Sequence, residues 1–234
     1  MKVDVYSVMR NEVKMVPYFL RHYETFADRI FVWDHRSDDG TREVLEAHPK
    51  VTVTTLDLER PDDGYFVNKL YSQYRNSRGY ADWAICVDGD EFVYHSDMLH
   101  KLEELKEKGV GKVRCEGFVM YHPVFPTTEG QIYDEVKMGM RDDQISTKVT
   151  IVDPEIELKW THGRHHCSRE RLAATDTGIL LLHFRLMGYD YYHEKSCKNE
   201  GFATSQRVHR TRKSMSREKF EDYMSTFQYT QVIA

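Results

Sequence analysis

Short apolar runs alternate with amphipathic stretches through the first half of the chain, and this alternation limits the fold more than any other feature. Residues 3–8, 29–33, 51–54, 83–87 and 112–118 have the pattern of strands. Helical spacing falls between them, over residues 13–26, 41–47, 66–78 and 98–108. Strands that alternate with helices form a mostly parallel sheet with helices on both faces. The sequence therefore predicts an α/β fold of the Rossmann type.

The second half of the chain, residues 121–234, is less regular. A long loop is expected over 121–132, where Pro123, Pro126 and Gly130 interrupt any regular pattern. Strands are expected over 145–152 and 178–182, and a closing helix over 217–227. No repeat or linker divides the 234 residues, so we expect a single domain over 1–234.

Composition limits the partners and the compartment. The net charge of −5 counts against broad binding of nucleic acid. Four scattered cysteines, the absence of a membrane-length apolar run and a start without a signal-peptide pattern favour a cytoplasmic location. A basic stretch at 207–217 is either a peripheral contact with the inner membrane face, a contact with an anionic substrate, or a solvated linker.

Three carboxylates follow the apolar strand pattern of 83–87. Asp88, Asp90 and Glu91 fall where this strand ends, around Gly89. Ligands of open α/β sheets bind at the carboxyl ends of the strands, and carboxylates there are suitable ligands for Mg²⁺ or Mn²⁺. The alternative is a simple hairpin turn, because Asp-Gly is also a common turn signal.

Polar clusters also follow the first two strands. Arg10-Asn11-Glu12 follows the first strand, and Asp34 ends the second, ahead of Asp38-Asp39-Gly40-Thr41. Parallel strands end at one edge, so we expect these clusters to meet the carboxylates there. Alternatively, Asp38 and Asp39 only cap a helix and Asp34 belongs to a turn.

These three segments together resemble a family 2 glycosyltransferase of the GT-A fold. Val5-Tyr6-Ser7-Val8-Met9-Arg10-Asn11-Glu12 is similar to the start of the family's Arg-Asn-Glu-containing branch, and Asp34 to Thr41 and Asp88-Gly89-Asp90 are similar to its later motifs. The resemblance covers residues 1–120 well. It extends weakly to Gly130-Gln131-Ile132-Tyr133-Asp134-Glu135 and Leu182-His183-Phe184-Arg185.

The resemblance implies transfer of a sugar, with inversion, from a nucleotide-sugar donor to a carbohydrate or glycoconjugate acceptor. Residues 1–120 would bind the donor and residues 121–234 the acceptor. Asp34 would hold the base and Asp88 would lie near the ribose, while Asp88, Asp90 and His183 would hold Mn²⁺ or Mg²⁺. The full donor-binding set is Arg10, Asn11, Glu12, Asp34, Arg36, Asp39 and Asp88.

The general base has to come from the second half of the chain. The candidates are His165, Glu135 and Asp143. His183 follows the apolar residues 179–182, and we expect it at a strand end, as a metal ligand or as a core-edge histidine bonded to the backbone. The spacing of His162, His165, His166 and Cys167 matches no zinc motif.

Two other functions stay open on sequence grounds. A metal-dependent nucleotidyltransferase or phosphotransferase would use paired carboxylates in the same way, although the first strand–helix turn has no Walker pattern. A sugar- or nucleotide-binding module would keep the fold without turnover.

Overall fold

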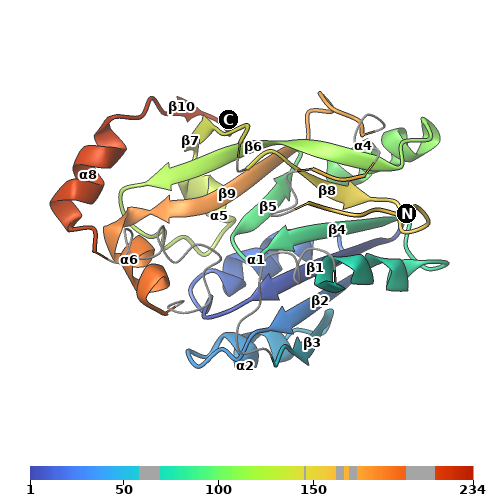
Figure 1. Cartoon of the computed structure of the whole chain (residues 1–234), viewed down its shortest axis with the longest axis horizontal. Helices are drawn as coiled ribbons and strands as arrows, with labels where there is room; N and C mark the ends of the chain where they lie inside the picture. The colour runs from blue at the N-terminus through green and yellow to red at the C-terminus, as the bar shows by residue number, and fades with distance from the viewer. Residues whose placement is uncertain (58–68, 145, 162–165, 169–172, 199–213, 234) are drawn as a thin grey trace.

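The computed structural model describes residues 1–57, 69–144, 146–161, 166–168, 173–198 and 214–233. Within them a ten-stranded sheet runs through the molecule, with helices packed around it (Figure 1). The path along the sheet is β10-β7-β6-β8-β4-β1-β2-β3, and β9 joins β6 to β5. The chain is therefore a mixed α/β protein, as its sequence predicts.

Four parallel strands form the first half of the sheet, in the order β4-β1-β2-β3. These strands are β1 (Val3–Met9), β2 (Arg29–Asp34), β3 (Val51–Thr55) and β4 (Trp83–Asp88). The helices between them are α1 (Val16–Tyr23), α2 (Thr41–Glu46) and the 3₁₀ helix η2 (Tyr71–Ser77). Helix α1 begins three residues later than expected, with Pro17 in its first turn, where the missing N–H of proline costs no helical hydrogen bond.

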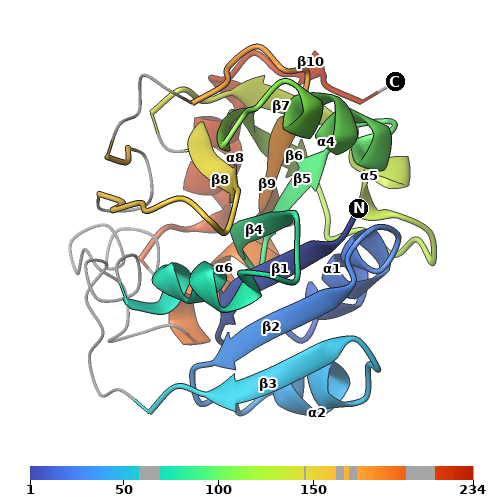
Figure 2. The same cartoon turned by 90° about the vertical axis from the view of Figure 1, so that its right-hand side faces the viewer.

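Both faces of the parallel strands are covered. Val5 and Ile85 belong to the larger apolar cluster, which includes residues of α1, α2 and α4 (Met98–Glu107). The neighbouring residue on each strand points the other way, so Tyr6 and Cys86 pack with η2 in a second cluster. Figure 2 shows α1 and α2 on one side of β1, β2 and β3. The predicted covering of the sheet is confirmed.

The second half extends the sheet with strands of mixed direction. β8 (Lys148–Val152) lies antiparallel between β4 and β6 (Lys112–His122), and β6 pairs with β9 (Leu180–Met187) in parallel. The remaining strands are β5 (Glu91–Tyr94), β7 (Met138–Arg141) and β10 (Thr230–Gln231), and the remaining helices are α5 (Ile132–Glu135), α6 (Gly188–Lys198) and α8 (Arg217–Ser225). The parallel arrangement thus characterises the first half, and antiparallel pairs predominate among the added strands.

Several predicted bounds are wrong. The strand expected over 178–182 runs to Met187, which places His183 inside β9 rather than at its end. Strand β6 reaches His122, so the predicted loop is shorter than expected. Residues 66–68 of the helix expected over 66–78 and the basic residues 207–213 lie outside the described part. Among the described residues, no helix is long and apolar enough to cross a membrane.

Candidate functional site

The predicted meeting of three strand ends is confirmed by the register of the sheet. Met9 of β1 lies opposite Asp34 of β2, and Val8 lies opposite Asp88 of β4. The chain leaves β1 through β2 and β3 on one side and returns to β4 on the other side. The strand order therefore reverses between β1 and β4. This is the place where ligands bind in open α/β sheets, just beyond the carboxyl ends of the strands.

The loops after β1 and β2 form one hydrogen-bonded unit. Arg10 Nη1 donates to the carbonyl of His35 at 2.5 Å. The Asn11 amide donates to Ser37 Oγ at 3.0 Å, and Asn11 Oδ1 accepts from the Asp38 amide at 3.0 Å. Asn11 has a φ of 53°, a left-handed conformation that asparagine tolerates better than most residues. Arg10 and Asn11 thus hold the two loops together, and their contacts with a donor stay predictions.

Asp34 has one carboxylate oxygen for which the described part of the chain supplies no hydrogen-bond partner. Its Oδ2 accepts from the Ser37 amide at 3.3 Å and lies 3.8 Å from Arg42 Nη1. Its Oδ1 is buried and finds no hydrogen-bond partner among the described residues. A buried oxygen of this kind costs free energy unless a ligand N–H or O–H reaches it. This observation supports the predicted role of Asp34 in holding the base.

The other predicted donor residues of this loop are engaged within the protein. Asp39 Oδ1 accepts from the Thr41 amide at 3.0 Å, and Asp39 Oδ2 accepts from the Val13 amide at 3.2 Å. Asp39 thus ties the start of α2 to the loop after β1, although the N-cap residue of α2 is Gly40 and no side chain caps the helix there. Arg36 pairs with Asp57 on the surface. Donor contacts by Asp39 and Arg36 stay predictions.

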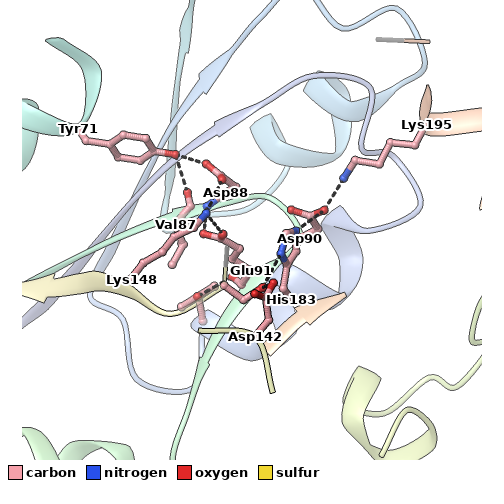
Figure 3. A network of polar contacts seen from close by, with 11 residues as sticks. Tyr71, Val87, Asp88, Asp90, Glu91, Asp142, Lys148, His183 and Lys195 are labelled. Atoms are coloured by element: carbon pink, nitrogen blue, oxygen red, sulfur yellow. Dashed lines mark hydrogen bonds and ion pairs between the residues drawn. The ribbon is translucent and has the colours of Figure 1, made fainter. Parts of the chain in front are cut away.

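The segment Asp88-Gly89-Asp90-Glu91 turns the chain from β4 into β5. It is not a hairpin, because β5 pairs with β9. Asp88 accepts a hydrogen bond from the Tyr71 hydroxyl, and Glu91 points inward, where Oε1 lies 2.5 Å from Lys148 Nζ. Glu91 is fully buried, so its role is structural. The Asp90 carboxylate instead points toward His183 and Lys195 (Figure 3).

Asp90 meets His183 in the centre of the site. The Asp90 Oδ2 to His183 Nε2 distance is 3.4 Å, and both residues are buried. On the other side of the ring, His183 Nδ1 lies 3.4 Å from Ser146 Oγ, which donates to Asp142 Oδ2 at 3.1 Å. Polar partners of this kind orient a histidine for ligand binding. Asp142 thus belongs to this chain of contacts, whereas its neighbour Asp143 is a predicted base candidate.

Helix α6 adds two residues that the sequence analysis missed. Lys195 Nζ lies 2.6 Å from Glu12 Oε1 and 2.7 Å from Asp90 Oδ2. One helical turn earlier, the Tyr191 hydroxyl donates to Glu12 Oε2 at 3.4 Å. Polar and aromatic residues dominate this helix, so its apolar periodicity is weak. The i, i+4 spacing of Tyr191 and Lys195 was the available signal.

Burial and charge set the protonation of these groups. Burial raises the pKa of Glu12 to about 7, despite the nearby ammonium of Lys195. Burial also acts to raise the pKa of Asp90, but Lys195 and His183 outweigh it and hold that pKa well below its usual value. The two carboxylates raise the pKa of Lys195 well above normal against the effect of burial. Asp90 and Lys195 are therefore charged at neutral pH.

The predicted metal ligands are brought together in part. Asp90 and His183 converge, whereas Asp88 is directed toward Tyr71 and lies 3.7 Å from Lys148 Nζ. No three His, Cys, Asp or Glu side chains of the described residues gather closely enough to hold an ion. Two protein ligands nevertheless suit Mg²⁺ or Mn²⁺, which take their other ligands from phosphates and water. The ammonium of Lys195 shows that the site accommodates positive charge.

Two of the three predicted base candidates, Glu135 and Asp143, make their described contacts away from this centre. Glu135 Oε2 accepts from the amides of Thr127 and Thr128, at 3.2 Å each, and holds the preceding loop. Asp143 is exposed and pairs with Arg141 at 3.0 Å. His165 lies outside the described residues. Their catalytic roles stay predictions.

Similarity to known proteins is confined to solved structures. No protein-family model and no curated protein matches the chain. Residues 1–349 of S. aureus TarS are 13% identical, with 97% of this chain and 73% of that chain covered and a TM-score of 0.45. The same protein in complex with UDP-GlcNAc is 12% identical over 96% and 73% of the two chains, with a TM-score of 0.48.

Glucosyl-3-phosphoglycerate synthase from Mycobacterium tuberculosis, in complex with Mn²⁺, UDP and glucosyl-3-phosphoglycerate, is also similar. It is 18% identical over 50% of this chain and 44% of that chain, with a TM-score of 0.37. Identities of this size say nothing about individual residues of the site.

Proposed function

We propose that this protein is a glycosyltransferase that uses a nucleotide-sugar donor. One observation carries the proposal. The strand order reverses between β1 and β4, and the polar residues of the site lie at that point. On one side Asp34 offers a buried oxygen that no described residue contacts by a hydrogen bond, and the pair of Asp90 and His183 lies on the other side. This arrangement suits a ligand that has a nucleoside at one end and a diphosphate at the other.

Different residues would contact different parts of such a donor. Asp34 Oδ1 accepts an N–H or O–H of the nucleoside. Asp90 and His183 would hold Mn²⁺ or Mg²⁺, and such an ion would stabilise the negative charge that develops on the leaving diphosphate. Ser146 keeps the His183 ring in the orientation that directs Nε2 toward Asp90.

In the proposed reaction, an acceptor hydroxyl forms a bond to the anomeric carbon as the bond from that carbon to the diphosphate breaks. The hydroxyl proton goes to a general base. We place this base among His165, Glu135 and Asp143 and propose inversion at the anomeric carbon, with a carbohydrate or glycoconjugate as the acceptor.

The first test is the binding of UDP, GDP and dTDP with and without Mn²⁺, followed by thermal unfolding. A nucleotide at one hundred times its dissociation constant adds about 2.7 kcal/mol to the free energy of unfolding. We expect one nucleotide to raise the melting temperature and Mn²⁺ to enlarge the shift. Asp90→Asn should remove the Mn²⁺-dependent part, while the exposed Glu107→Gln on α4 should retain it. The absence of any shift with every nucleotide would disprove the donor site.

Product analysis separates this function from the two alternatives. A glycosyltransferase releases the nucleoside diphosphate from its donor when an acceptor mixture is added. A nucleotidyltransferase or phosphotransferase breaks a phosphate bond instead and leaves a different nucleotide product. A binding module binds the donor and releases nothing.

A further inference from the structure

Lys195 reaches the site from a helix that is remote in sequence from the acidic residues it contacts. Its ammonium lies between Glu12 Oε1 and Asp90 Oδ2, at 2.6 Å and 2.7 Å. Figure 3 shows the side chain extended from α6 toward Asp90, on the side away from Asp88. Glu12 and Asp90 are both less than one-tenth exposed. Buried carboxylates need a cation nearby, and here the protein supplies it.

The same oxygen of Asp90 faces both Lys195 and His183. Asp90 Oδ2 is 2.7 Å from Lys195 Nζ and 3.4 Å from His183 Nε2. A divalent ion held by Asp90 and His183 would use this oxygen and would meet the ammonium there. Two cations repel each other strongly where little water screens them. The ammonium and the ion therefore do not share Asp90 Oδ2.

The ammonium has a second carboxylate partner that would keep it in the site if it left Asp90. Lys195 has a second carboxylate partner in Glu12, and Tyr191 fastens the same helix to the same glutamate. The side chain of Lys195 is 23% exposed, compared with 6% for Lys148, so part of its length is in contact with solvent. These contacts would allow Lys195 to keep its pairing with Glu12, with α6 in place, after losing Asp90.

We propose that Lys195 and a divalent ion compete for Asp90, so that the lysine is the cation of the donor-free site and lowers its affinity for free metal. The inference rests on the metal-binding part of the proposed function. When the ion takes Asp90, the ammonium stays near Glu12, beside the position proposed for the diphosphate of the donor. A lysine released in this way is a further contact for that diphosphate.

The test measures Mn²⁺ binding to the donor-free protein by titration calorimetry. Lys195→Met removes the competing charge and should bind Mn²⁺ at least tenfold more tightly than the wild type. Lys195→Arg keeps the charge and should not show this gain. Asp90→Asn in the Lys195→Met background should abolish the gain, because the ion loses its main ligand.

A matched control removes a neighbouring lysine whose described ion pair is with neither Glu12 nor Asp90. Lys14 lines the same small pocket as Lys195 but pairs with Glu194. Lys14→Met should leave the Mn²⁺ affinity within about twofold of the wild type, since charges at a solvent-exposed pair are screened. If Lys195→Met fails to fold, Lys195→Gln removes the charge but keeps a hydrogen-bonding group on the side chain, and it should show the same gain.

An Mn²⁺ affinity that is unchanged or weaker in both Lys195→Met and Lys195→Gln would overturn the competition. Nucleotide binding to the wild type is measured in parallel. If the wild type binds a nucleotide and both Lys195 variants have an unchanged Mn²⁺ affinity, only the role of Lys195 is refuted and the proposed function stands. A failure to bind any nucleotide would refute the proposed function and leave the measured competition as a property of an ion site.

Discussion

Two buried carboxylates in the turn after β4 each pair with a lysine from a distant part of the chain. Glu91, in the turn after β4, pairs with Lys148 of β8, and Asp90 pairs with Lys195 of α6. The first pair has almost no contact with solvent and is structural. The second is partly exposed and lies where we propose that the donor binds. At the residue scale, adjacent acids in one turn therefore have different roles, which their lysine partners determine.

His22 gives the clearest prediction of pH-dependent stability. It is buried in α1, its Nε2 is 2.9 Å from the carbonyl of Val93, and its Nδ1 has no partner among the described residues. Burial lowers its pKa from 6.5 to about 4. Between these values the unfolded chain binds a proton that the folded chain does not, so the free energy of unfolding falls as the pH is lowered. The shift corresponds to about 3 kcal/mol.

Urea unfolding at several pH values between 7 and 4 measures this effect. The variant His22→Phe keeps an aromatic ring but cannot titrate, so its stability should fall less steeply over this range than that of the wild type. Other titrating groups are common to both proteins and cancel in the difference. Equal slopes for the two proteins would show that His22 does not control acid stability.

Among elements, the connection between β9 and α6 determines where Lys195 lies. Gly188 begins α6 with a φ of 78°, and a Cβ there would come within 2.7 Å of the Pro123 carbonyl oxygen. Gly109, which follows α4, has a similar φ of 71° but open space around it. The two glycines thus share a left-handed backbone and differ in their surroundings.

This contrast predicts different costs for the same substitution. Gly109→Ala should lower the free energy of unfolding by about 1–2 kcal/mol, the cost of a left-handed backbone for alanine. Gly188→Ala should cost clearly more, because the methyl group also pushes α6 away from the loop at Pro123. Chemical denaturation measures both costs. Similar values for the two variants would mean that the loop yields easily and that Gly188 does not hold α6.

The sequence predicted the strands of the first half, which carry Asp34, Asp88 and Asp90, better than the elements of the second half, which carry His183 and Lys195. Strands β1, β2 and β4 are short apolar runs with polar ends, so Asp34, Asp88 and Asp90 could be placed at one edge of a sheet. Helix α6 could not be found in this way, because its tyrosines and charged residues have no clear apolar stripe. The apolar run before His183 suggested that the strand ended there. In fact β9 continues through His183, because Asp90 gives this polar side chain a partner inside the protein.

On the scale of the molecule, one sheet crosses both halves of the chain. Strand β8 pairs with β4 of the first half and with β6, which leads into the second. The buried residues Glu91 and Lys148, 2.5 Å apart, connect the two halves near the site. A boundary near residue 120 therefore separates the predicted donor and acceptor regions without separating two cores. We expect the chain to unfold as a single unit.

Lys148→Met tests this expectation, because it removes the cation from a buried carboxylate. Removing one partner of such a buried ion pair lowers the free energy of unfolding by about 3–5 kcal/mol. If the halves unfold together, the loss appears equally in far-UV circular dichroism and in the fluorescence of Trp33 and Trp83, measured with Trp160 replaced by Phe. The double variant Glu91→Gln with Lys148→Met should recover much of the loss, since the unpaired charge is gone. Two separate transitions would instead show that the halves fold independently, with the ion pair stabilising only their junction.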